Sequence, residues 1–206
     1  MQKLKLEYYP PIQGEFSLKK LNFLFVFQVN CPGCFMYGIP LVDSLYRDFG
    51  EQISFLGLST AFEDFDLNTE ENTNKLISSG EMIGETQKAF STQGTSKYPI
   101  EIAFPIAMDR FADHTFDMKA AAEDICLSNP NFSYWPEFEK NELRKRVTDY
   151  LKSQVCIPLT FTLNQMRGTP TFILFNERYE ILRHYFGHQE ASNLRGELKE
   201  MLSVNN

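Results

Sequence analysis

The chain has 206 residues, of which 43% are hydrophobic and 23% are charged, so its composition is that of a folded globular protein rather than a disordered one. Its net charge of −7 argues against a nucleic-acid-binding surface, and its first residues, Met1 to Glu7, lack the apolar core of a signal peptide. No window approaches the ~18 uninterrupted apolar residues of a membrane helix, so we expect a single cytoplasmic domain over residues 1–206, without a membrane partner.

The first predicted elements form a strand–helix–strand unit. Leu21 to Val29 is an apolar run that predicts a buried strand, and Ile53 to Ser59 predicts a second strand that is apolar on both faces. Between them lies a predicted helix that ends at Gly50 and is expected to kink near Gly38 and Pro40. Its apolar face consists of Phe35, Ile39, Val42, Tyr46 and Phe49. This order is the βαβ pattern.

Two cysteines, Cys31 and Cys34, lie at the turn between the first strand and this helix, in the sequence Cys-Pro-Gly-Cys. At that point Cys31 falls at the helix N-cap and Pro32 at the first helical position, where its missing N–H costs nothing. The free amides of the first turn and the helix dipole then stabilise a thiolate at Cys31. A zinc-binding pair, a structural disulfide and two inert buried thiols are the alternatives, but a redox role fits the spacing best.

The middle of the chain is mostly helical in its pattern. Residues 68–78 and 81–90 predict two helices, residues 91–99 a surface loop, and residues 104–109 a strand at whose start or edge a proline lies. Residues 110–155 predict further helix and contain an apolar loop with Phe132, Tyr134 and Trp135. We expect this loop to be packed against the protein, where it could lie beside the redox turn. We expect Cys126 and Cys156 to be free thiols, with no evident role in electron relay.

The last fifty residues predict a hairpin and a closing helix. Gly168-Thr169-Pro170 lies directly before a strand at 171–175, a turn separates it from a strand at 180–186, and a helix with an apolar face follows. Proline cannot donate into a strand ladder, and an X–Pro bond can be cis at a tight turn.

Taken together, these motifs resemble the thioredoxin-like superfamily, and within it the TlpA/ResA-type and redoxin-domain thiol–disulfide oxidoreductases. The residues that carry the resemblance are Cys31, Pro32, Cys34, Pro40, the run Arg167 to Thr171 and Gly187. It covers about 21–62, 104–109 and 160–203, whereas residues 1–20 and 111–155 look like elaborations. The resemblance implies an α/β thioredoxin-like fold, with a central mixed sheet flanked by helices and a mostly helical insertion at about 111–155.

The resemblance also implies roles for individual residues. Cys31 would be the exposed attacking thiolate and Cys34 the buried resolving thiol, and Pro170 would be cis, next to the sulfurs. Substrate contacts are expected at Pro32, Gly33, Arg167, Thr169 and Pro170, with the Thr169 backbone offering strand-like hydrogen bonds and Arg167 either assisting the thiolate or merely solvated. No metal or organic cofactor is implied.

Two features depart from thioredoxin itself. Phe25 stands where thioredoxin has a buried aspartate beneath its cysteines, and the residues between the cysteines are Pro-Gly instead of Gly-Pro. The reduction potential of thioredoxin therefore does not transfer to this chain.

The expected function is reduction of protein disulfides through a mixed disulfide, with a disulfide-containing protein or a small thiol as substrate and an unidentified electron donor. A peroxiredoxin-like thiol peroxidase is one alternative, although that family typically has a threonine where this chain has Gln28. A non-enzymatic binding module with a redox latch is the other.

Overall fold

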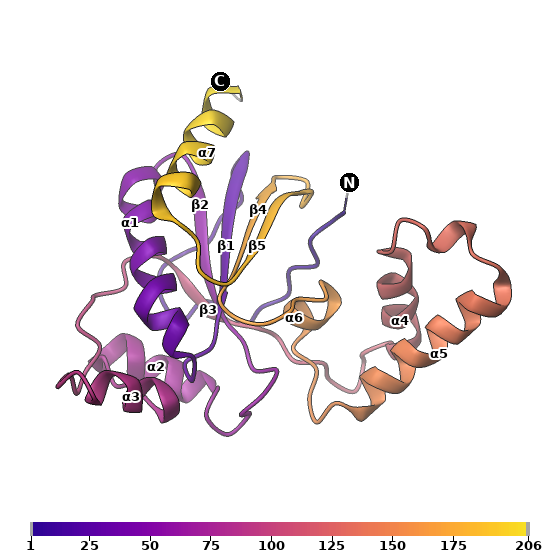
Figure 1. The fold of residues 1–206 in the computed structure, drawn as a ribbon, viewed down its shortest axis with the longest axis horizontal. Coiled ribbons are helices and arrows are strands. Elements are labelled where there is room, and N and C mark those ends of the chain that lie inside the picture. Colours follow the sequence, from indigo (N-terminus) through magenta and orange to yellow (C-terminus); the bar gives the residue numbers. More distant parts are fainter. Residues whose placement is uncertain (1, 205–206) are drawn as a thin grey trace.

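A computed structural model of the chain describes residues 2–204, and these form a mixed five-stranded sheet with the strand order β3-β2-β1-β4-β5 (Figure 1). The strands are β1 Leu21–Phe27, β2 Ser54–Ser59, β3 Ile106–Met108, β4 Thr171–Asn176 and β5 Ile181–Phe186. β1, β2 and β3 run parallel, whereas β4 pairs antiparallel with both β1 and β5. The predicted α/β fold class is confirmed.

Helices cover one face of the sheet (Figure 1). α1 Ile39–Phe49 and α7 Ala191–Val204 lie along this face, and α2 Glu70–Ser79 and α3 Gly84–Ser91 lie beside the start of α1, beyond the ends of the strands. Phe23, Phe25 and Phe27 alternate along β1 toward this face, and all three are completely buried. The largest apolar cluster of the protein therefore lies between the sheet and these helices.

The helix that follows the redox motif contains a π-helical turn, Cys34–Gly38, before it continues as α1. The predicted kink near Gly38 and Pro40 is thus realised as a change of hydrogen-bond pattern, in which the Ile39 N–H donates to the Cys34 carbonyl. The helix predicted at 81–90 begins three residues later, at Gly84, because Glu81 pairs with Lys97 as an isolated bridge.

The other face of the sheet is covered by the N-terminal segment and by α6, Leu159–Leu163. Leu4 belongs to this second cluster together with Leu24 and Val26 of β1. The same segment closes the β3 edge, where the Tyr9 N–H donates to the Met108 carbonyl at 2.9 Å. Residues 2–13 therefore lie along the sheet and pair with its β3 edge, with Leu4 buried in the second cluster.

A helical insertion separates β3 from α6 and projects away from the sheet (Figure 1). It consists of α4 Met118–Leu127, a 3-10 turn at Phe132–Tyr134 and α5 Glu137–Ser153. The chain leaves and re-enters the sheet through a short antiparallel stem, in which the Ala112 N–H donates to the Ile157 carbonyl at 2.9 Å and the Leu159 N–H to the Arg110 carbonyl at 2.8 Å. An apolar cluster joins α4 and α5 of the insertion to Leu159 and Leu163 of α6.

Candidate active site

The Cys31–Cys34 turn begins a helix at the end of β1, as the sequence predicts. The Cys34 N–H donates to the Cys31 Sγ at 3.2 Å and to the Cys31 carbonyl at 3.0 Å, which is the geometry of an N-cap. Cys31 is partly exposed, whereas Cys34 has 0% of its surface exposed. The Cys31 sulfur is therefore accessible to a second molecule, whereas the Cys34 sulfur is buried.

The pKa values of the two thiols are shifted in opposite directions. A hydrogen bond from the Cys34 side chain, opposed by burial and assisted by Thr169 and by amides of the turn, lowers the pKa of Cys31 to about 7. Burial raises the pKa of Cys34 well above its ordinary value, and the neighbouring Cys31 adds to this effect. At neutral pH the pair therefore holds one proton firmly, on Cys34, and one loosely, on Cys31.

The loop before β4 forms the second half of the site. The Thr169–Pro170 peptide bond is cis, and the Cys31 Sγ donates to the Thr169 carbonyl at 3.8 Å. The Gly187 N–H fixes the other side of the loop by donating to the Pro170 carbonyl at 2.9 Å. The Thr169 N–H has no hydrogen-bond partner among residues 2–204.

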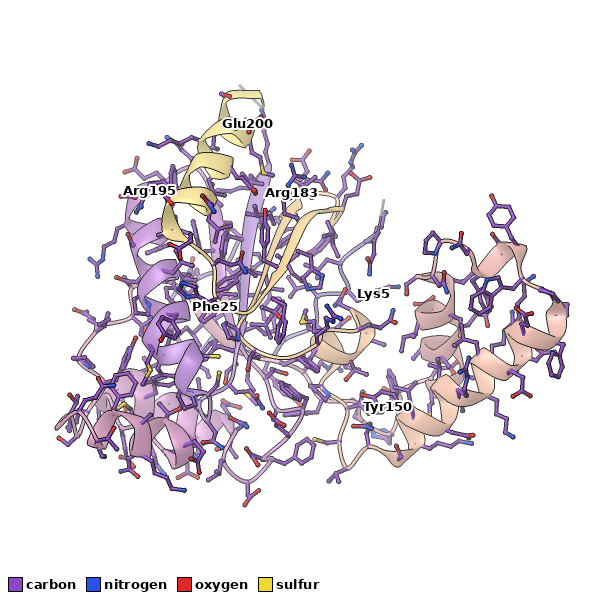
Figure 2. All side chains as sticks on the ribbon, in the orientation of Figure 1. Lys5, Phe25, Tyr150, Arg183, Arg195 and Glu200 are labelled. Carbon is purple, nitrogen blue, oxygen red and sulfur yellow. The ribbon has the colours of Figure 1, made fainter. Side chains whose placement is uncertain are left out.

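Aromatic rings form the floor beneath the two cysteines. Phe25 stacks on Phe27 and on Phe172, with ring centroids 5.2 and 5.3 Å apart respectively, and it lies between α1 and the sheet (Figure 2). A Cβ atom at Gly38 would come within 2.8 Å of the Phe25 ring and 3.4 Å of Pro170. Glycine at this position lets the π-helical turn approach both the floor and the loop.

Asn30, directly before Cys31, was not identified from the sequence and connects three segments around the turn. Its N–H donates to Asn68 Oδ1 at 2.9 Å, its Nδ2 donates to Asp64 Oδ2 at 2.8 Å, and its Oδ1 accepts from the Glu85 N–H at 2.7 Å. The sequence signal was a polar residue closing an apolar run, but its partners lie 34 to 55 residues away.

The remaining predicted contact residues differ in position. Pro32 and Gly33 are partly exposed beside Cys31, and a Cβ at Gly33 would meet nothing within 4 Å, so this side of the turn is open. Arg167 is exposed and has no hydrogen bond or ion pair with any residue in 2–204. The structure thus gives no contact between Arg167 and the sulfurs.

Cys126 and Cys156 are free thiols, and Cys126 is buried in α4 while Cys156 is partly exposed after α5. Within residues 2–204, no three His, Cys, Asp or Glu side chains gather where they could hold a metal ion. The helices described there are all too short or too polar to cross a membrane.

The aromatic loop of the insertion is packed in part, and it lies elsewhere than expected. Phe132 is 2% exposed beneath the Arg144 guanidinium, whereas Tyr134 is 86% exposed. The loop joins α4 to α5 at the far end of the insertion, away from the start of α1 (Figure 1). The expectation that it packs beside the redox turn is wrong, because the stem directs both helices outward.

Solved structures share this architecture. A thiol-disulfide isomerase from Corynebacterium glutamicum superposes with a TM-score of 0.60 at 21% identity, over 98% of this chain and 96% of its own. A protein of the thioredoxin-like superfamily gives a TM-score of 0.56 at 22% identity, over 98% and 97% of the two chains. No family model and no curated protein matches the sequence. The chain therefore has a thioredoxin-like fold, and the predicted resemblance is confirmed at that level.

Proposed function

We propose that this protein is a thiol–disulfide oxidoreductase that reduces disulfides of protein substrates. The observation that carries the proposal is the asymmetry of the CxxC pair: a partly exposed Cys31 whose pKa is lowered to about 7, in front of a buried Cys34 whose pKa is raised. An attacking thiol is fastest when its pKa is near the ambient pH. Both fold relatives carry names from this field, one of them as a thiol-disulfide isomerase.

The proposed exchange has two steps. The Cys31 thiolate attacks one sulfur of the substrate disulfide, so that a mixed disulfide forms and a substrate thiolate leaves and takes a proton from water. Cys34 then loses its proton and attacks the Cys31 sulfur, which forms the Cys31–Cys34 disulfide and releases the second substrate thiolate. Two electrons pass to the substrate, and an unidentified donor restores the dithiol.

A cavity whose lining ends three residues before Thr169 in the sequence is our reason to propose a protein as the substrate. A cavity of about 420 Å³ opens between α5 and α6, and its apolar lining includes Leu143, Val147, Tyr150, Phe161 and Met166. Met166 precedes Thr169 by three residues, so the backbone between them spans at most ~11 Å. An extended peptide bound along Thr169 can place an apolar side chain in this hollow. We therefore propose that the insertion, as part of one domain over residues 1–206, selects the substrate.

Trapping of mixed disulfides tests the function. In Cys34→Ser the first exchange remains and the resolving thiol is missing, so disulfide-linked partners should accumulate on Cys31. Cys31→Ser is the matched control, because it keeps one thiol of the pair and lacks the attacking one. Equal recovery of linked protein from both variants would contradict the proposed function.

The direction of electron flow depends on the reduction potential of the pair. Equilibration of the Cys31–Cys34 couple against glutathione measures it, and ~30 mV corresponds to a factor of ten for a two-electron couple. A potential near or below that of a reducing cytoplasm supports the proposed reductase and the cytoplasmic location. A strongly oxidising potential would indicate that the protein introduces disulfides instead.

A further inference from the structure

Gln28 is a buried amide that connects β1 to both sides of the redox site. It follows the last residue of β1 and is 2% exposed. Its Nε2 donates to the Glu63 carbonyl at 3.4 Å, and its Oε1 accepts from the Thr169 hydroxyl at 3.2 Å. Because Nε2 is held by Glu63, the acceptor oxygen of the amide faces the loop that contains the cis-proline.

The Thr169 hydroxyl has more than one acceptor within reach. In the structure it donates to Gln28 Oε1, while the Cys31 Sγ lies 3.8 Å from the carbonyl of the same threonine. Hydrogen bonding by the Thr169 side chain also lowers the pKa of Cys31 and acts in the same direction on Cys34. A hydroxyl has one proton and can donate only one strong hydrogen bond at a time. Donation to Gln28 and donation to a sulfur are therefore alternatives.

We propose that Gln28 is a positioning residue of the redox pair, which competes with the sulfurs of Cys31 and Cys34 for the hydroxyl proton of Thr169. This proposal deepens the proposed function and rests on it. In the dithiol form the hydroxyl donates to Gln28, as in the structure. When Cys31 releases its proton to water, the hydroxyl turns to the thiolate, because a charged acceptor is stronger than an amide oxygen. The turn is a rotation of the O–H bond alone, and no other proton moves.

Gln28 therefore limits how strongly the thiolate is favoured, since each thiolate must first draw the hydroxyl away from the amide. Other charged side chains border the site and are unchanged by substitutions at Gln28. They are Glu63 and Asp64 before α2, Glu85 in α3, Arg167 ahead of Thr169, and His188, whose ring contacts Tyr37 in the turn. Cys34 is the titratable group that is hydrogen-bonded to Cys31.

The pH dependence of Cys31 alkylation tests the proposal. Gln28→Met keeps an unbranched side chain of similar length and removes the competing acceptor, so the midpoint of the alkylation profile should move down. At a pH below the midpoint, the rate should rise about threefold, which is the effect of one neutral hydrogen bond. Thr169→Val removes the donor and should lower the same rate by about threefold, whereas Thr169→Ser keeps the hydroxyl and should restore it.

The double variant separates competition from general loosening of the site. With Thr169→Val present there is no hydroxyl to compete for, so adding Gln28→Met should leave the midpoint where Thr169→Val alone puts it. A Gln28→Met protein with an unchanged or higher midpoint would overturn the proposal, and so would an equal shift in both backgrounds.

A second substitution covers the case in which Gln28→Met does not fold. Gln28→Glu retains the size and strengthens the acceptor, so the midpoint should move up, and a downward shift would contradict the competition. Alkylation does not require turnover. A protein that fails the mixed-disulfide trap but shows these shifts would therefore refute the proposed function and leave the role of Gln28 in thiolate formation standing.

Discussion

We expect Cys31 and Cys34 to differ in reactivity, because their sulfurs lie at different depths around one helix start. The Cys31 sulfur accepts an N–H from the first turn and remains partly exposed. The Cys34 sulfur is enclosed in the apolar cluster that also contains Phe25, whose ring stacks on Phe172. Burial raises the pKa of Cys34, so in the proposed mechanism this thiol loses its proton only once the mixed disulfide has formed.

Alkylation should therefore select Cys31. Brief treatment of the reduced protein with iodoacetamide at pH 7 should label Cys31 at least ~10-fold more than Cys34 or Cys156, because an ordinary thiol is only a few per cent ionised at that pH. The rate should rise through a midpoint of about 7 as pH increases, since the thiolate is the reacting form. Cys156 is an internal control, because it is partly exposed and burial raises its pKa. Mass mapping that finds the label mainly on Cys34 would contradict the assignment.

Asp109 is a buried carboxyl whose proton affects stability. Burial, opposed by hydrogen bonds from Thr60 and from the amides of Thr160 and Phe161, raises its pKa to about 7. A carboxyl whose pKa is raised on folding stabilises the fold fully below its unfolded pKa of ~4, and this contribution is lost as pH rises through about 7.

The free energy of unfolding of the wild type, relative to Asp109→Asn, should accordingly fall between pH 4 and pH 8, by roughly 4 kcal/mol at most. Urea denaturation at several pH values measures it. The exposed Asp113 is a contrasting control: hydrogen bonds from Thr115 lower its pKa, so Asp113→Asn should show the opposite slope. A relative stability that does not change with pH would mean that Asp109 keeps one protonation state throughout.

These residues also show what the sequence alone can reveal. The cysteine pair, the Gly-Thr-Pro turn and the order of strands and helices are local patterns, and the structure has them where they were predicted. Gln28, Asn30 and Asp109 are different, because each is defined by hydrogen bonds to residues tens of positions away, up to 141 for Gln28 and Thr169. A polar residue at the end of an apolar run has no periodic signal that announces such partners.

At the level of elements, the π-helical turn Cys34–Gly38 explains why Tyr98 is buried with its hydroxyl on the backbone of the helix. With the Ile39 N–H bonded to the Cys34 carbonyl, the Phe35 carbonyl would next be paired by residue 40, but Pro40 has no N–H. The Tyr98 hydroxyl fills the gap by donating to the Phe35 carbonyl at 2.9 Å, from the loop between α3 and β3. The loop predicted as mere surface thus supports the helix that carries Cys34.

Tyr98→Phe should therefore destabilise the protein by about 1–3 kcal/mol, because it leaves a buried carbonyl without a donor while the ring remains. The Tyr98 ring packs edge-on against Phe35 and Phe90, and phenylalanine can keep both contacts. Urea denaturation gives the loss, and Tyr37→Phe, at a tyrosine that is 53% exposed, is the matched control with an expected change under ~0.5 kcal/mol. Equal stability of the two variants would show that the carbonyl finds another partner.

At the scale of the whole molecule, the insertion is joined to the rest of the protein at the stem and through the apolar cluster that it shares with α6. Asp109 ends β3 and accepts the first amides of α6, so it fixes both points where the chain crosses between the two parts. A peripheral contact is the ion pair between Lys5 and Asp124 at 2.8 Å, with about half of each side chain exposed. Lys5 points from the N-terminal segment toward the insertion (Figure 2). Such an exposed pair contributes ~1 kcal/mol at most, so the stem and the shared apolar cluster are the stronger links.

This geometry allows the insertion to be removed at a defined place. Ala112 and Ile157 are hydrogen-bonded neighbours at the stem, so residues 113–156 can be replaced by a short Asn-Gly turn without spanning a gap. The active-site cysteines Cys31 and Cys34, the Thr169 loop and the aromatic floor lie outside the excised segment. We expect the variant to reduce a small disulfide at a rate within about threefold of the wild type, a change of under 1 kcal/mol in the activation free energy. We also expect it to lose its preference among protein substrates. Removing α5 takes away one side of the cavity between α5 and α6. In the proposed function, that side of the cavity selects the substrate. Replacing only the loop 129–136 with Gly and Ser is the milder variant if the excised protein does not fold, and it too should leave small-disulfide reduction unchanged. A loss of about a hundredfold or more on the small disulfide, in either variant while it remains folded, would place the insertion in the chemistry of exchange and contradict the division of labour proposed for the two parts.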